Sequence, residues 1–134
     1  MDDAAFAVRL RDATNTRNVE RVVACFAADY VNQTPAHPVR GFTGIDQVRR
    51  NWTQIYAAVP DHTAALVASS QDGETVWTEW EMRGTRVDGR RHLMRGVIVF
   101  TVHEGLASAA RFYVEPVDDA EIDADSAVDR IVSS

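Results

Sequence analysis

The sequence predicts an α+β fold in which a curved antiparallel sheet wraps around three N-terminal helices to form a cone. Two observations support this prediction. Apolar residues recur at helical spacing through most of the first sixty positions, and long runs of strand-like alternation joined by tight turns follow them. Helices segregated from a later run of antiparallel strands are typical of the α+β class. The open end of such a cone is a natural ligand pocket.

The N-terminal part of the chain carries three helical patterns. Asp2 or Asp3 is expected to cap the first helix, which breaks at residues 14–16. Asn18 is expected to cap the second, and its apolar positions are Val19, Val22, Val23 and Phe26. A short strand at 30–32 and a loop rich in proline and glycine should follow.

Thr43 and Asp46 resemble a capping box that opens the third helix. Pro60 and Asp61 should end it. The next segment, 63–70, reads as a strand, and residues 71–73 as the turn that follows it.

Three long strands are expected between Glu74 and Pro116: TVWTEWEMRGT, RRHLMRGVIVFTV and LASAARFYVEP. The turns between them contain Gly89 and Gly105, and glycine supplies the positive φ that a hairpin return needs. The sheet is therefore expected to be a continuous meander.

The two faces of this meander differ in chemistry, because side chains alternate along a strand. Even positions are almost all apolar, whereas odd positions hold three acids and three arginines. Burying those charges would cost several kcal/mol per ion, while leaving the large apolar side chains in water would forfeit roughly 1.5 to 3 kcal/mol each. The even face is therefore expected to point inward, although Gly84 or Gly96 could host a bulge that changes the parity locally.

The length of 134 residues corresponds to one domain. We divide it into a cone domain, 1–117, and an acidic tail, 118–134. The tail holds six acids against Arg130, so it carries −5 of the net charge of −6. The tail is expected to be a solvated segment or a weak helix over 118–132 that docks on the body. The chain has no basic surface pattern of the kind that binds nucleic acid, so no nucleic-acid partner is expected.

Several chemistries are excluded by residue types. All fourteen basic residues are arginine, so lysine-dependent Schiff-base, pyridoxal phosphate and P-loop chemistry is excluded. Cys25 is the single cysteine and is expected to be a buried, inert thiol. The four histidines lack paired metal-ligand spacing, so we expect no metal site and no cofactor. Without a signal peptide or a long apolar run, a cytoplasmic location with no membrane contact is expected.

The loop after residue 32 should form the rim of the cone and is the best place for catalytic groups. His37 could act as an acid or base near neutral pH, or could be a solvated residue of a rigid turn. Asn32 could orient a ligand carbonyl, or could cap the loop backbone. His62 is expected near a helix C-terminus, and His92 and His103 are expected to be exposed at hairpin ends.

The predicted ligand pocket combines the rim residue Thr34 with large apolar side chains that should face inward. These side chains could equally be plain core, but a cone leaves part of them free to meet a ligand. The apolar members are Trp52, Tyr56, Trp80, Met82, Met94 and Phe112.

Five segments, spread over roughly residues 4 to 117, resemble motifs of one known family: ACFAADY, GFTGIDQVRRNW, VPD, DGETVWTEWEMRGTRVDG and RFYVEPV. On these segments the chain resembles the nuclear transport factor two-like cone and, within it, the SnoaL-like relatives of polyketide cyclases. The resemblance implies a curved-sheet fold with an internal pocket. The scaffold hosts isomerases, cyclases, hydrolases and binders, so the fold does not select among them.

Two enzyme types within this resemblance lack their functional groups here. The three key residues of ketosteroid isomerases correspond to Leu10, Thr34 and Gly96, and those of limonene epoxide hydrolases to Trp80, Met82 and Phe112. The acid that SnoaL-type cyclases use near the end of the last strand corresponds to Glu115. Glu115 is thus a third catalytic candidate beside His37 and Asn32, with an outward ion pair as the alternative.

The resemblance also implies a homodimer, since related cones pair through their outer sheet faces. Arginine and aromatic residues are enriched at such contacts. The outer positions concerned are Trp77, Glu79, Arg95, Val97, Arg111 and Tyr113.

Three functions remain open. The pocket could bind a small hydrophobic, ring-containing molecule, or an enzyme of the cyclase, isomerase or hydrolase type could transform such a molecule by acid/base chemistry. Alternatively, the chain could be a dimeric interaction module whose cone is filled by its own side chains.

Overall fold

The computed structural model describes residues 4–133 as four α-helices, one short 3-10 helix and a six-stranded sheet. The expected caps Asp2 and Asp3 lie outside the described residues. The elements, in chain order, are α1 Ala4–Asn15, α2 Val19–Val23, β1 Phe26–Gln33, η1 Pro38–Arg40, β2 Phe42–Thr43, α3 Ile45–Ala58, β3 Thr63–Asp72, β4 Thr75–Thr85, β5 Arg91–His103, β6 Leu106–Pro116 and α4 Ala124–Ser133. The predicted α+β class is confirmed.

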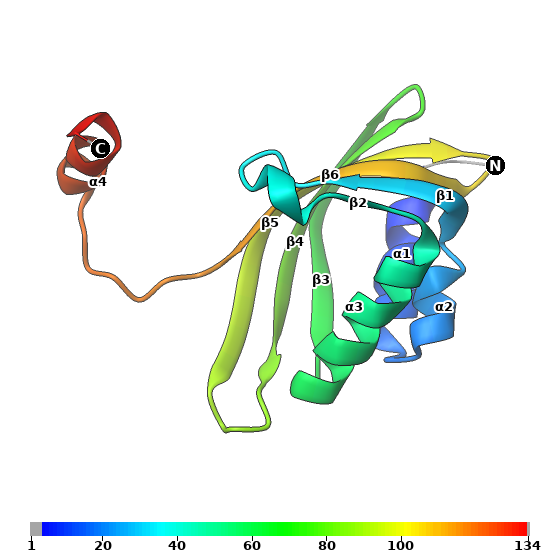
Figure 1. Ribbon diagram of the computed structural model, residues 1–134, viewed down its shortest axis with the longest axis horizontal. Coiled ribbons are helices and arrows are strands. Elements are labelled where there is room, and N and C mark those ends of the chain that lie inside the picture. Colours follow the sequence, from blue (N-terminus) through cyan, green and yellow to red (C-terminus); the bar gives the residue numbers. More distant parts are fainter. Residues whose placement is uncertain (1–3, 134) are drawn as a thin grey trace.

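The strand order in the sheet is β2-β1-β6-β5-β4-β3. The sheet curves without closing, and helices α1, α2 and α3 lie together on one side of it (Figure 1). All neighbouring strands are antiparallel except β1 and β6, which run parallel. The sheet is therefore mixed rather than purely antiparallel, and the parallel pair places the loop after β1 beside the end of β6.

The predicted parity of the meander is confirmed. Trp80, Ile98 and Phe100 on the even face are almost fully buried. The Phe6 ring of α1 packs edge-on against Phe100 at a centroid distance of 5.0 Å. The register between β4 and β5 runs without a bulge through both Gly84 and Gly96, so the two strands keep the same parity along their paired length.

Two local predictions differ from the structure. Phe26 was expected in the second helix, but α2 ends at Val23 and Phe26 begins β1, where it pairs with Ala107. The capping box at Thr43 and Asp46 is wrong, since Gly44 is the N-cap of α3 and no side chain caps it. A tertiary strand pairing outweighs the local helical spacing in the first case.

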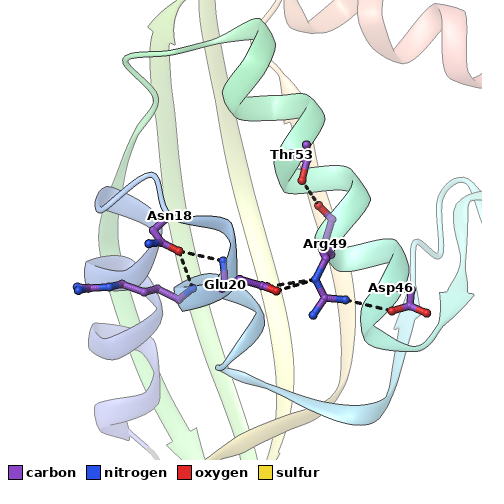
Figure 2. Close-up of polar contacts among 6 residues, drawn as sticks. Asn18, Glu20, Asp46, Arg49 and Thr53 are labelled. Atoms are coloured by element: carbon purple, nitrogen blue, oxygen red, sulfur yellow. Dashed lines mark hydrogen bonds and ion pairs between the residues drawn. The ribbon is translucent and has the colours of Figure 1, made fainter.

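Asn18 caps α2 as predicted, and its side chain accepts hydrogen bonds from the backbone N–H groups of Glu20 and Arg21. Figure 2 shows how the capped turn is tied to α3, because the Glu20 carboxylate accepts from Nε of Arg49 at 2.8 Å. Arg49 also reaches Asp46 at 3.1 Å. This surface network holds α3, which carries much of the pocket wall, against α2.

The acidic tail contains a helix, α4, and none of the residues of this helix is buried. It projects away from the body at the end of an extended segment (Figure 1). The structure thus combines the two alternatives for this segment, since it is helical as in one and solvated as in the other. No helix among residues 4–133 is long and apolar enough to cross a membrane.

Candidate functional site

The concave side of the sheet holds an inner pocket of about 260 Å³. It lies between β1, β2, β6 and α3, and its wall is mostly aromatic and aliphatic. Its lining residues are Phe26, Tyr30, Asn32, Thr34, Arg40, Phe42, Val48, Asn51, Trp52, Ile55 and Phe112. Three of the predicted pocket residues, Thr34, Trp52 and Phe112, therefore meet around one cavity.

Strand β1 supplies the polar group of the inner pocket. Tyr30 and Asn32 are two residues apart and both point inward, and the Tyr30 hydroxyl donates to Oδ1 of Asn32 at 2.7 Å. Burial raises the pKa of Tyr30, so the phenol stays neutral and keeps its proton for this bond. With Oδ1 engaged, the amide Nδ2 group is the part of Asn32 that can donate to a ligand.

A larger pocket of about 770 Å³ opens between the C-terminal half of α3, the β4–β5 hairpin and the end of β6. Asn51 and Ile55 line both pockets, so the two spaces adjoin. The volume falls in the range of small-molecule sites, roughly 300 to 1,000 Å³. The other lining residues are Gln54, Ala58, Val59, Arg86, Arg90, Arg91, His92, Leu93, Met94, Pro116, Val117 and Asp119.

His92 lies in the wall of this larger pocket and is half-buried, although the sequence predicted an exposed hairpin end. Its even position on β5 turns it to the inward face, so the alternation already contained this signal. Burial, and secondarily the positive charge of Arg86, lower the pKa of His92 below its usual value. The neutral imidazole is thereby favoured at neutral pH.

His62 lies behind His92, with 5.8 Å between the ring centroids. It is 1 % exposed and is packed against Trp52 and Tyr56. Burial, followed by the charges of His92 and Arg17, lowers the pKa of His62 to about 4. His62 follows the C-terminal end of α3 as expected, but desolvation outweighs the favourable effect that a helix dipole has on a charged imidazole.

The Nδ1 atom of His62 is the one buried side-chain nitrogen or oxygen without a hydrogen-bond partner in the described part of the chain. An unpaired polar atom in a core costs about 1 to 3 kcal/mol. The His62–His92 pair was not predicted from the sequence. It depends on β4, where Gly84 pairs with His92 and lies close to the backbone of His62.

The catalytic candidates predicted from the sequence divide between two places. His37 and Glu115 form an ion pair, with Nε2 of the imidazole 2.8 Å from Oε1 of the carboxylate, and their side chains are 39 % and 50 % exposed. This pair lies outside the linings of the two pockets described above. Asn32 points into the inner pocket, so it is not grouped with them.

The remaining predicted pocket residues take different positions. The Tyr56 hydroxyl donates to the carbonyl of Thr14 at 2.7 Å, and the Trp80 indole N–H donates to Oγ1 of Thr78 at 2.7 Å. Trp80 is buried in the core and Met82 is packed against it. Met94 alone among these four lines the larger pocket. The single pocket predicted from the sequence is therefore replaced by two smaller spaces.

Among residues 4–133, no group of three or more histidine, cysteine, aspartate or glutamate side chains is placed to hold a metal ion. Cys25 is buried as predicted, and this burial raises the pKa of its thiol. A neutral thiol is a poor nucleophile. The polar groups that line the two pockets are the imidazole of His92, amides, guanidinium groups, the Tyr30 phenol, the Thr34 hydroxyl and the Asp119 carboxylate.

Comparison with solved structures shows the same fold in several proteins. IdmH, a proposed polyketide cyclase from Streptomyces antibioticus, is 21 % identical with a TM-score of 0.74, over 86 % of this chain and 93 % of that one. A proposed ketosteroid isomerase from Kribbella flavida is 22 % identical with a TM-score of 0.67, over 90 % and 82 %. An uncharacterised cystatin-fold protein from Novosphingobium aromaticivorans is 20 % identical with a TM-score of 0.68, over 84 % and 97 %.

None of the curated proteins matches this sequence. The model of the SnoaL-like domain family matches residues 7–110, which include most of α1, all of α2 and α3, and the sheet up to the middle of β6. The chain belongs to the SnoaL-like family.

Proposed function

We propose that the protein binds a small hydrophobic, ring-containing molecule in the two adjoining pockets and transforms it by acid/base chemistry of the cyclase or isomerase type. One observation carries the proposal: an apolar pocket inside the sheet adjoins a larger pocket that has an imidazole in its wall. The fold is shared with a proposed polyketide cyclase and a proposed ketosteroid isomerase, which supports this class of reaction.

The inner pocket suits a flat, apolar ring. Trp52 of α3 and Phe112 of β6 belong to its wall and offer aromatic surfaces for stacking. The Asn32 amide is the donor available for a carbonyl oxygen of the ring. Such a donor stabilises the negative charge that develops on this oxygen when a neighbouring carbon loses a proton.

His92 is the group that we assign to proton transfer. It lies in the pocket wall, and its lowered pKa keeps the imidazole neutral and able to accept a proton. His62 does not line either pocket and is assigned a positioning role behind His92. The exposed His37–Glu115 pair remains the alternative acid/base group predicted from the sequence.

A panel of polycyclic ketones and aromatic polyketide analogues tests this proposal. We expect at least one compound to quench tryptophan fluorescence and to raise the melting temperature, because Trp52 lines the inner pocket. Trp52→Phe should lose the quench and keep the melting shift. Trp77→Phe should keep both, since Trp77 lies on the outer face.

Turnover of a bound compound then distinguishes the catalytic assignments. His92→Asn is expected to lower turnover about 100-fold or more with binding retained, the effect typical of losing a general acid or base. His103→Asn is the matched control, because His103 lies at the far end of β5. If turnover falls in His37→Asn and not in His92→Asn, the proton transfer belongs to the His37–Glu115 pair instead. If no compound of the panel binds, the proposed function is refuted.

We also propose that two copies pair through the outer face of the meander. Trp77 and Tyr113 are 46 % and 45 % exposed on this face, beside the paired charges of Glu81 and Arg95. Light scattering is expected to give twice the chain mass of 14.9 kDa. Trp77→Arg combined with Tyr113→Arg should give a single chain mass with unchanged circular dichroism, and a wild-type mass of one chain would contradict the pairing.

A further inference from the structure

The tip of the β4–β5 hairpin concentrates positive charge at the larger pocket. Residues 83–95 hold five arginines against Asp88, in a chain whose net charge is −6. Three of these arginines, Arg86, Arg90 and Arg91, line the pocket. Helix α3 contributes the apolar side chains Ile55 and Ala58 and the amides Asn51 and Gln54, so the cationic edge shares one space with apolar and neutral polar groups.

The three guanidinium groups differ in how far they are neutralised. Asp88 holds Arg90, with 3.0 Å from Nε and 2.9 Å from Nη2 to the same carboxylate oxygen. Arg91 reaches Asp119 at 3.6 Å only, and the Asp119 side chain is 92 % exposed. This distance exceeds the roughly 2.7 to 2.9 Å of a charge-assisted hydrogen bond, so the contact is weak and open to displacement.

Arg86 differs from both, because no carboxylate of residues 4–133 lies within ion-pair distance of its guanidinium group. Its charge contributes to the lowered pKa of His92 in the pocket wall and also to the lowered pKa of Asp88. Arg86 and Arg91 are therefore two cationic groups beside one partly apolar space. The carboxylates near them are Asp88, which is bound to Arg90, and Asp119, which is held only at 3.6 Å from Arg91. A guanidinium binds a carboxylate or phosphate through two parallel hydrogen bonds, which suits it to this task.

We infer that the ligand carries an anionic group, a carboxylate or a phosphate, which Arg86 and Arg91 hold at the mouth while its apolar body lies along α3 toward the inner pocket. This inference rests on the proposed function, because it specifies the class of molecule that the same pockets bind. The anionic group anchors one end of the molecule beside His92, and the ring at the other end extends toward the inner pocket and Asn32.

Two dyes of nearly the same shape test the charge separately from the apolar fit. Anilinonaphthalene sulfonate is anionic, and N-phenylnaphthylamine is its counterpart without the sulfonate. At neutral pH and low salt, we expect the protein to bind the anionic dye at least tenfold more tightly than the neutral dye, as judged by dye fluorescence. The preference should weaken as salt is added, because the guanidinium groups are exposed.

Arg86→Gln combined with Arg91→Gln should abolish the preference and leave the affinity for the neutral dye unchanged. Arg21→Gln combined with Arg50→Gln removes the same charge from the helices and should keep the preference. Displacement of the anionic dye by naphthoate or by naphthyl phosphate then shows which anion the arginines favour.

The outcomes separate the two proposals. If the neutral dye binds but the anionic dye has no advantage, or if the pocket double variant keeps that advantage, the anion inference is wrong and the apolar pocket stands. If neither dye binds, the proposed ligand-binding function fails together with the inference.

Discussion

Acidification from pH 7 to pH 4.5 is expected to lower the free energy of unfolding by about 2 kcal/mol through His62 alone. The pKa of this buried imidazole is about 4 in the folded protein, against roughly 6.5 in an unfolded chain. Between these two pKa values, the imidazole of His62 is protonated in the unfolded state and neutral in the folded state. The stabilisation is complete above pH 6.5 and is lost as the pH falls toward 4.

The surroundings of His62 explain why its folded form stays neutral. Trp52 and Tyr56 pack against the ring and exclude water, and His92 faces it from β5. Arg17 donates to the backbone carbonyl of His62 at 3.1 Å, which brings a further positive charge close. The carboxylate of Asp61 opposes these effects, but it is exposed and weaker.

Urea unfolding at the two pH values measures this effect. In His62→Gln the loss on acidification should be smaller than in the wild type by about 2 kcal/mol. Arg21→Gln should show the wild-type loss, because Arg21 is exposed and an arginine stays charged at both pH values. Any change that the His62 substitution causes in absolute stability cancels, since each protein is compared with itself. An equal loss in all three proteins would show that His62 takes up its proton in the folded state.

The alternation of the long strands predicted both the sheet and the direction of its faces. This succeeded because one face is buried and large apolar residues recur with a period of two from Val76 to Phe100. The pattern is interrupted by the buried Val99 and by the register shift between Thr101 and Val102. The end of α2 was predicted less well. Val19, Val22, Val23 and Phe26 have helical spacing, yet Phe26 joins β1 through a parallel pairing with β6. Nothing local to those residues indicates a partner eighty positions away.

The candidate site was predictable to a smaller extent than the fold. Thr34, Trp52 and Phe112 were predicted and do line the inner pocket. The His37–Glu115 contact and the His62–His92 contact each join distant segments, and they follow from strand pairings that composition cannot specify. The interior was predicted as one open space, whereas Trp80 and Phe100 fill its base and leave two pockets.

Gly96→Ala is expected to destabilise the protein by about 3 kcal/mol or more. Gly96 lies in the middle of β5, in register with Trp80 on β4 and Val114 on β6. A Cβ at this position would overlap the backbone carbonyl oxygen of Tyr113 and lie 2.6 Å from Cα of Val114. These are backbone atoms of a paired strand, so the added methyl group can be accommodated only if β5 and β6 move apart.

The predicted loss of stability is opposite in sign to the usual effect of replacing glycine by alanine in a strand. Replacing glycine by alanine inside a strand normally stabilises by roughly 0.5 to 1 kcal/mol, because the unfolded chain loses conformational freedom. Here the clash should exceed that gain several-fold. Gly89→Ala is the matched control, since Gly89 has a positive φ of 88° but open space around its Cβ position; it should cost about 1 to 2 kcal/mol.

Urea unfolding followed by circular dichroism compares the two variants at neutral pH. The expected result is a much lower midpoint for Gly96→Ala than for Gly89→Ala, with similar slopes. If Gly96→Ala unfolds at the same urea midpoint as the wild type, β5 and β6 can move apart with little loss of stability. In that case the wall that carries Phe112 would be adjustable, and the inner pocket could widen to admit larger rings than its volume of about 260 Å³ allows.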